Sequence, residues 1–223
     1  MVVAKCAAKE MTVPVNFKLE YTGNQVSVIL FETTTYSVQT YCLNKINKSS
    51  EPELVTLCKA VLDYGAAAQY YFDYKTDELA NAGTYYTEPG DINVPEHNMA
   101  TNVSADVKKL SISVSLESMT ELNFYVGGPG LSVEKVTCGT KPVDYTIVSI
   151  SDTSCMVKVK GIAAKELNND YTLTFTTQGG NNTVTYSPMT FAYRNRNSKA
   201  EAYLSDVSRQ LYNYYQAAFD YFN

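Results

Sequence analysis

Residues 33–73 read TTTYSVQTYCLNKINKSSEPELVTLCKAVLDYGAAAQYYFD, and residues 183–223 read TVTYSPMTFAYRNRNSKAEAYLSDVSRQLYNYYQAAFDYFN. The two stretches align without a gap at an offset of 150 positions, and thirteen of the 41 aligned residues are identical. An internal repeat of this kind favours a scaffold or an array over an enzyme. The identical pairs are Thr33/Thr183, Thr35/Thr185, Tyr36/Tyr186, Ser37/Ser187, Thr40/Thr190, Asn47/Asn197, Glu51/Glu201, Leu54/Leu204, Tyr64/Tyr214, Ala67/Ala217, Ala68/Ala218, Tyr71/Tyr221 and Phe72/Phe222.

The second half of each copy predicts an amphipathic helix. Within residues 51–73 and 200–222, apolar side chains recur at three- and four-residue spacing, which places them on one helix face. A serine followed three residues later by glutamate predicts a capping box at each start, formed by Ser50/Glu53 and Ser198/Glu201. We expect the repeated face of both helices to pack on a sheet.

The remainder of the chain predicts short strands. Apolar and polar residues alternate in several segments with turn signals between them, as at Gly23-Asn24 and at Gly179-Gly180-Asn181-Asn182. The predicted fold is therefore mostly β with α. It consists of antiparallel β-sandwich units in two related copies, each followed by a C-terminal amphipathic helix packed on sheet. The alternating segments are 13–21, 26–30, 110–116, 122–126, 171–175 and 184–186, with further alternation around Val133, Tyr145, Val157 and Val159.

The two units are not equally complete. AAKEM at residues 7–11 matches AAKEL at 163–167, so about fifty residues corresponding to 106–156 have no counterpart in the first unit. Two interpretations are open: the first unit is a trimmed piece of a longer protein, or its strands complete themselves against the second unit. We predict an N-terminally incomplete β-plus-helix unit at 1–75, a linker at 76–105, and a β-sandwich-plus-helix unit at 106–223.

Composition excludes several classes of function. The 223-residue chain carries a net charge of -5, and its 18 Lys and Arg residues are scattered, so we expect no nucleic-acid partner. No apolar run approaches the roughly 20 residues that span a bilayer, which predicts no membrane insertion. The N-terminus MVVAKCAAKE also lacks the apolar core of a signal peptide.

The five cysteines predict packing side chains. None belongs to a CxxC pair, which leaves a zinc site without support. Cys42 aligns with Ala192 and Cys58 with Ser208, which predicts small buried side chains at these positions. Cys138 and Cys155 lie on neighbouring predicted strands, where a single disulfide is the alternative.

Catalytic residue types are scarce, and we predict that the chain is not an enzyme, with no catalytic residue, metal or cofactor. The one histidine, His97, lies in the polar linker beside Glu96 and near Asp91, where such residues usually serve as solvated side chains. The sequence nominates no pair of glycosidase carboxylates. Gly127-Gly128-Pro129-Gly130 lacks the Lys and Ser/Thr of a phosphate loop and predicts a tight strand connection.

Tyrosine is the residue in excess, with 19 copies and no tryptophan. Tyrosine suits glycan or protein recognition because it joins an apolar ring to a polar tip. The two units diverge most outside the repeat, so Tyr85, Tyr86 and Tyr125 are the predicted binding residues. The alternative is that these rings pin the linker against the second unit.

Several motifs resemble a module found at the ends of large secreted surface proteins of gut Firmicutes of the Ruminococcus and Lachnospiraceae type. They are LCKAVLDYGAAAQYYFDY at 57–74, TDELANAG at 76–83, TYSPMTFAY at 185–193, LYNYYQAAFDYF at 211–222 and the two AAKE boxes. The resemblance implies an extracellular, cell-surface location beside neighbouring domains of a larger polypeptide. It carries no catalytic residue.

Two functions remain open at the level of the sequence. The first is a non-catalytic cell-surface binding or adhesion module that recognises a polysaccharide or a host extracellular protein, with immunoglobulin as one candidate. The second is a structural spacer or assembly module that positions neighbouring domains. A row of exposed aromatics on a sandwich face would favour a glycan, and an exposed apolar patch on the helices would favour a protein.

Overall fold

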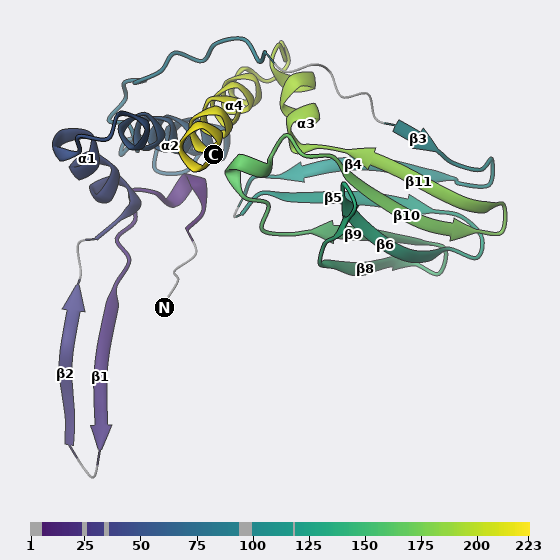
Figure 1. Ribbon diagram of the computed structural model, residues 1–223, viewed down its shortest axis with the longest axis horizontal. Coiled ribbons are helices and arrows are strands. Elements are labelled where there is room, and N and C mark those ends of the chain that lie inside the picture. Colours follow the sequence, from purple (N-terminus) through teal and green to yellow (C-terminus); the bar gives the residue numbers. More distant parts are fainter. Residues whose placement is uncertain (1–5, 24–25, 34–35, 94–99, 118) are drawn as a thin grey trace.

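The computed structural model describes residues 6–23, 26–33, 36–93, 100–117 and 119–223. It consists of a two-stranded hairpin, a group of helices, and two antiparallel sheets (Figure 1). The hairpin and the sandwich extend from the helices in different directions. The predicted combination of antiparallel sandwich and C-terminal helix is confirmed.

The first unit contains a 3₁₀ turn, a hairpin and two helices: η1 (Ala8–Glu10), β1 (Phe17–Gly23), β2 (Val26–Thr33), α1 (Val38–Lys48) and α2 (Pro52–Tyr71). The second unit ends in the same order with η2 (Ala164–Glu166), β10 (Tyr171–Thr177), β11 (Gly180–Tyr186), α3 (Pro188–Asn195) and α4 (Ala202–Phe222). Between them lie β3 (Ala100–Asn102), β4 (Lys109–Ser115), β5 (Glu121–Gly127), β6 (Ser132–Cys138), β7 (Lys141–Pro142), β8 (Tyr145–Ser151) and β9 (Ser154–Val159).

Two sheets face each other in the sandwich. One has the strand order β3-β11-β10-β6-β7 and the other β4-β5-β9-β8. Leu122, Phe124 and Val126 of β5 and Leu173 and Phe175 of β10 are fully buried, which places one side of each strand in the core. The period-2 burial confirms the strands that the alternating sequence predicted.

Matching backbone hydrogen bonds show that the two units share one local framework. The amide of Gln39 donates to the carbonyl of Met11 at 2.9 Å, and the amide of Met189 donates to the carbonyl of Leu167 at 3.0 Å. Each bond ties the start of a helix to the 3₁₀ turn that precedes the hairpin. The repeat in the sequence is therefore a repeat in the fold.

The structure has the two predicted helices as α2 and α4, and it adds a short helix, α1 or α3, ahead of each. Ser37 accepts a hydrogen bond from the amide of Thr40 and caps α1, and Ser187 caps α3 through the amide of Thr190. The predicted capping boxes at Ser50 and Ser198 are wrong, because α2 and α4 begin after Glu51 and Glu201 without a side-chain cap. In α2, Pro52 occupies the first turn, where its missing N–H needs no partner.

The expectation that both long helices pack chiefly on sheet needs correction, because α2 and α4 pack on each other. The equivalent rings of Tyr64 and Tyr214 stack with centroids 5.5 Å apart and planes inclined by 18°. Ala68 and Ala218, another equivalent pair, are buried and let the two backbones approach closely. Contact between equivalent residues indicates a local pseudo-twofold axis near the tyrosine pair.

The hairpin of the first unit is not completed by strands of the second. In the described residues β1 pairs with β2 alone, from Phe17 opposite Thr33 to Gly23 opposite Val26. Its counterpart β10–β11 lies between β6 and β3 in the five-stranded sheet. An isolated two-stranded hairpin is marginally stable in water. Further strands or another packed surface would therefore stabilise β1–β2.

All five cysteines are free. Cys42 and Cys58 are buried between α1 and α2, where their thiols interact, and the aligned Ala192 and Ser208 are buried as well. This arrangement fits the prediction of small packing side chains. Cys138 lies in the five-stranded sheet and Cys155 in the four-stranded sheet, and no disulfide joins them.

Leu54→Ala and Leu204→Ala provide a matched test of helix packing, since the two leucines occupy the same repeat position. Leu54 is buried and Leu204 is half-buried. We expect Leu54→Ala to lower the free energy of unfolding by about 2 to 5 kcal/mol and Leu204→Ala to lower it by less. Chemical denaturation measures both values, and a larger loss for Leu204→Ala would contradict the packing described.

Candidate functional site

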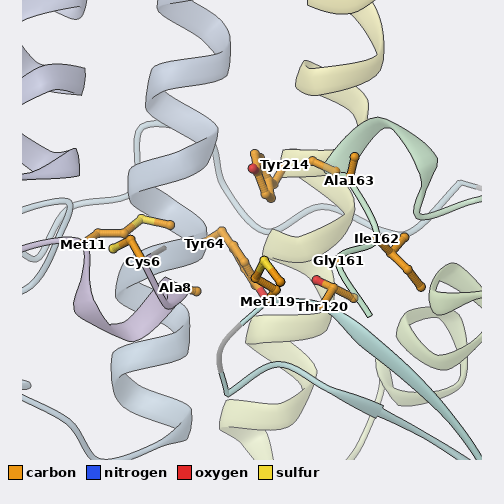
Figure 2. Close-up of a pocket in the computed structure, with 11 residues that line it drawn as sticks. Cys6, Ala8, Met11, Tyr64, Met119, Thr120, Gly161, Ile162, Ala163 and Tyr214 are labelled. Carbon is orange, nitrogen blue, oxygen red and sulfur yellow. The ribbon is translucent and has the colours of Figure 1, made fainter. Parts of the chain in front are cut away.

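A cavity of about 250 Å³ lies at the junction of the two units, and equivalent residues of both units line it. The pairs are Cys6/Ile162, Ala8/Ala164 and Tyr64/Tyr214. Met119 and Thr120 from the β4–β5 turn complete the wall (Figure 2). The cavity therefore lies close to the pseudo-twofold axis, where α2 and α4 meet.

The tyrosine pair gives this junction its chemistry. Tyr64 comes from the middle of α2 and Tyr214 from the middle of α4, so helical spacing aims both rings at the opposite helix. Burial raises the pKa of the Tyr64 hydroxyl, and the neighbouring Tyr214 raises it further. Burial also raises the pKa of Tyr214, with Cys42 as the second cause. Both hydroxyls therefore stay protonated at neutral pH.

An open groove of about 590 Å³ continues from the cavity and shares Ala163, Ala164 and Tyr214 with it. Its floor comes from the first half of α2, the last turns of α4 and the η2 turn. We use the name "open groove" for the surface lined by Leu57, Val61, Ala163, Ala164, Lys165, Tyr214, Ala218 and Phe222.

The open groove offers apolar contact with a cation at its rim. The Lys165 ammonium lies over the Phe222 ring, 5.7 Å from the centroid, and Phe222 is 57% exposed. None of the described residues that line the cavity or the groove is a histidine, aspartate or glutamate. These surfaces suit a ligand with an apolar side and an acidic group at its edge.

The cavity thiol is a poor nucleophile. Burial raises the pKa of Cys6, and the nearby Glu10 raises it further, so the reactive thiolate is disfavoured. Across the ranges that the structure describes, no group of three or more His, Cys, Asp or Glu side chains is placed to hold a metal ion. Glu96 and His97 of the predicted linker lie outside the described residues.

Tyr85, one of the predicted binding residues, is held by the second unit. Its hydroxyl donates a hydrogen bond to the carboxylate of Asp206 on α4. Burial and the bonded Asp206 carboxylate raise the pKa of Tyr85. This geometry supports a pinning role for the Tyr85 ring.

Tyr86 follows on the same segment, which is fastened to α2. The buried carboxylate of Asp63 accepts hydrogen bonds from the amides of Tyr86 and Thr87 at 3.0 and 2.8 Å and from the Asn81 side chain at 3.1 Å. Burial raises the pKa of Asp63, although these three donors oppose the shift. The Tyr86 ring itself remains exposed, with the Lys59 ammonium 6.0 Å from its centroid.

Tyr125 lies elsewhere, in the middle of β5 and not in a loop. It is half-buried and lines a hollow with Phe72 at the C-terminal end of α2. Lys59, which contacts Tyr86, and Phe72 are separated by about 20 Å along the helix. The structure thus places Tyr86 beside the middle of α2 and Tyr125 near its C-terminal end, and the three predicted tyrosines do not form one surface.

The sequence pattern assigned the helix residues Leu57, Val61, Tyr214 and Ala218 of the open groove to the core face. Leu57, Tyr214 and Ala218 belong to the repeated apolar face, and periodicity alone does not distinguish a covered face from an exposed one. The repeat itself was the signal that could have identified the groove. An apolar face that recurs in both units needs a covering element in each unit, and the sequence predicts one set of strands between the units, enough to cover one face.

Comparison with protein-family models, with curated proteins and with solved structures found no match for the chain. Within the described part of the chain, no helix combines the length and the apolar character required to cross a bilayer.

The buried tyrosine pair predicts a loss of stability in alkali. Ionisation of Tyr64 and Tyr214 is suppressed in the folded chain, whereas the unfolded chain ionises near pH 10. Their stabilising contribution is therefore present below about pH 10 and is lost as the pH rises toward the raised folded values. Each such tyrosine should lower the free energy of unfolding by up to about 1.4 kcal/mol per pH unit above that point.

Denaturation at pH 8 to 11.5 measures this dependence, and Tyr64→Phe should make the decline shallower because it removes one ionisable group. An equal decline in the two proteins would show that the Tyr64 hydroxyl titrates alike in the folded and unfolded chains. That result would contradict its burial at the junction.

Proposed function

We propose that the chain is a non-catalytic binding module of an extracellular, cell-surface protein and that its partner is a protein. The observation that carries this proposal is the open groove between α2 and α4. It is an apolar surface with an exposed aromatic, Phe222, at one end and a cation, Lys165, at its rim. Apolar grooves between helices commonly receive a helix or turn of another polypeptide.

The distribution of exposed side chains supports a protein over a polysaccharide. Sugars stack on flat aromatic rings, and the large exposed apolar residues on the four-stranded sheet are the aliphatic Ile147, Val148 and Ile150. The exposed aromatic rings of the helices include Tyr203, Phe219 and Phe222. The resemblance to secreted surface modules implies a partner outside the cell, where a host protein such as immunoglobulin is one candidate.

A structural spacer or assembly module is the second candidate. It is favoured by the pseudo-twofold framework, because a repeated unit that buries its counterpart can bury a further module in the same way. In this role the partner is a neighbouring domain of the same large polypeptide.

Phe222→Glu tests the proposed function. The full chain is screened against serum and mucosal proteins and against a glycan array. Phe222→Glu should weaken binding of a captured protein at least tenfold, because it places a carboxylate at the groove. Phe219→Glu is the matched control, since Phe219 lies on the same helix, is also exposed, and does not line the groove.

Two results would contradict the proposal. One is a polysaccharide as the ligand, and the other is a protein ligand that binds Phe222→Glu and the parent chain equally. Tyr86→Ala and Tyr125→Ala in the same screen test the predicted tyrosines. Unchanged affinity with a lowered melting temperature would assign their rings to packing.

A further inference from the structure

The pseudo-twofold axis gives the open groove a counterpart, and that counterpart is covered. Ala163, Ala164 and Lys165 correspond to Ala7, Ala8 and Lys9, and the facing helix positions correspond likewise. Ala7 and Ala8 are 7% and 5% exposed, whereas Ala163 is exposed and Ala164 half-buried. The covered counterpart consists of Ala7, Ala8, Lys9, Tyr64, Ala68, Phe72, Val207 and Leu211.

The cover is the β4–β5 turn of the sandwich. Leu116 is 4% exposed, belongs to the main core and lines one hollow with Phe72. Next to it, the Glu117 carboxylate pairs with the Lys9 ammonium at 3.5 Å. Met119 and Thr120 of the same turn lie beside Ala8 and Tyr64 in the cavity wall (Figure 2). An apolar residue followed by a carboxylate therefore fills the covered groove.

The strand pairing of the two hairpins also indicates that a sandwich would cover the open groove. The sandwich that supplies this turn also flanks the hairpin of its own unit, because β6 pairs with β10 and β3 pairs with β11. In the first unit β1–β2 has neither flanking strand among the described residues. By the pseudo-twofold relation, strands placed beside β1–β2 would direct their turn to the open groove.

We propose that β1–β2 and the open groove form one docking surface for a sandwich segment of the same kind as residues 100–160, carried by another module of this type. The incoming segment adds strands to the hairpin by β-augmentation. Its turn places the residue equivalent to Leu116 in the groove, with the equivalent of Glu117 near Lys165. This inference rests on the proposed function and names the partner class of its groove.

The extended chain for the test consists of a second copy of residues 100–160 followed directly by residues 5–223. Residue 5 is the position equivalent to Gly161, which follows residue 160 in the second unit. Hydrogen exchange is measured on the parent and extended chains. We expect amides of β1–β2 that do not bond within the hairpin, and amides of η2, to exchange at least tenfold more slowly in the extended chain. Leu116→Asp in the added copy alone should abolish the slowing at η2, and Phe222→Glu should do the same.

An added segment whose own strand amides are protected while β1–β2 exchanges as in the parent chain would overturn the inference. The same conclusion follows if the segment fails to fold beside β1–β2 at all, because the proposal requires the hairpin to complete it. A dimer of the parent chain that Phe222→Glu dissociates would assign the groove to a second copy instead.

The outcomes separate this inference from the proposed function. If a screened protein binds through Phe222 and the added segment does not dock, the binding module stands and the named partner is wrong. If the added segment docks and the screen yields no protein ligand, the groove serves assembly between modules.

Discussion

The stack of Tyr64 on Tyr214 is the contact on which the arrangement of the molecule depends. It joins the same residue of two related units, so each unit presents to the other the surface that it needs to bury. Small residues beside the rings, Ala68 and Ala218 among them, allow the helices to approach closely enough for the rings to overlap. Both rings line the junction cavity, and Tyr214 also lines the open groove.

The two units share a framework but use it differently at positions where their sequences diverge. Gln69 is fully buried and bonds the carbonyls of Lys75 and Glu78, whereas the aligned Phe219 is exposed. Asp63 binds the segment that follows α2, and the aligned position holds Asn213. The first unit thus uses buried polar residues to fasten the connecting segment along the helices. The second unit also contacts this segment, since Asn213 donates to the carbonyl of Glu88 at 3.3 Å, but it leaves Phe219 exposed where the first unit buries Gln69.

Local pattern predicted much of this fold. The repeat identified the two units, period-2 alternation identified β4, β5, β9, β10 and β11, and three- and four-residue spacing identified α2 and α4. Periodicity does not show which element packs on an apolar helix face, because a sheet or another helix can bury it equally well. A sheet was therefore expected where a second helix lies. The short helices were missed, although Ser37 with Thr40 and Ser187 with Pro188 carry start signals.

The candidate site was less accessible to sequence reasoning than the fold. Tyr85, Tyr86 and Tyr125 were selected because they lie outside the repeat, and the structure separates them. The groove residues lie in the repeated segments. Equivalent residues of the two units are alike in sequence there, so the sequence does not show which of them are exposed. Only the placement of the sandwich turn over one of two equivalent surfaces distinguishes Ala8 from Ala164.

A double-mutant cycle on the tyrosine pair tests the central claim most directly. Tyr64→Ala, Tyr214→Ala and the double variant are compared by chemical denaturation. Stacked rings in contact should give a coupling free energy of about 0.5 to 1.5 kcal/mol. A coupling within about 0.3 kcal/mol of zero would show that the two rings act independently, and would contradict a fold built on the contact of equivalent residues.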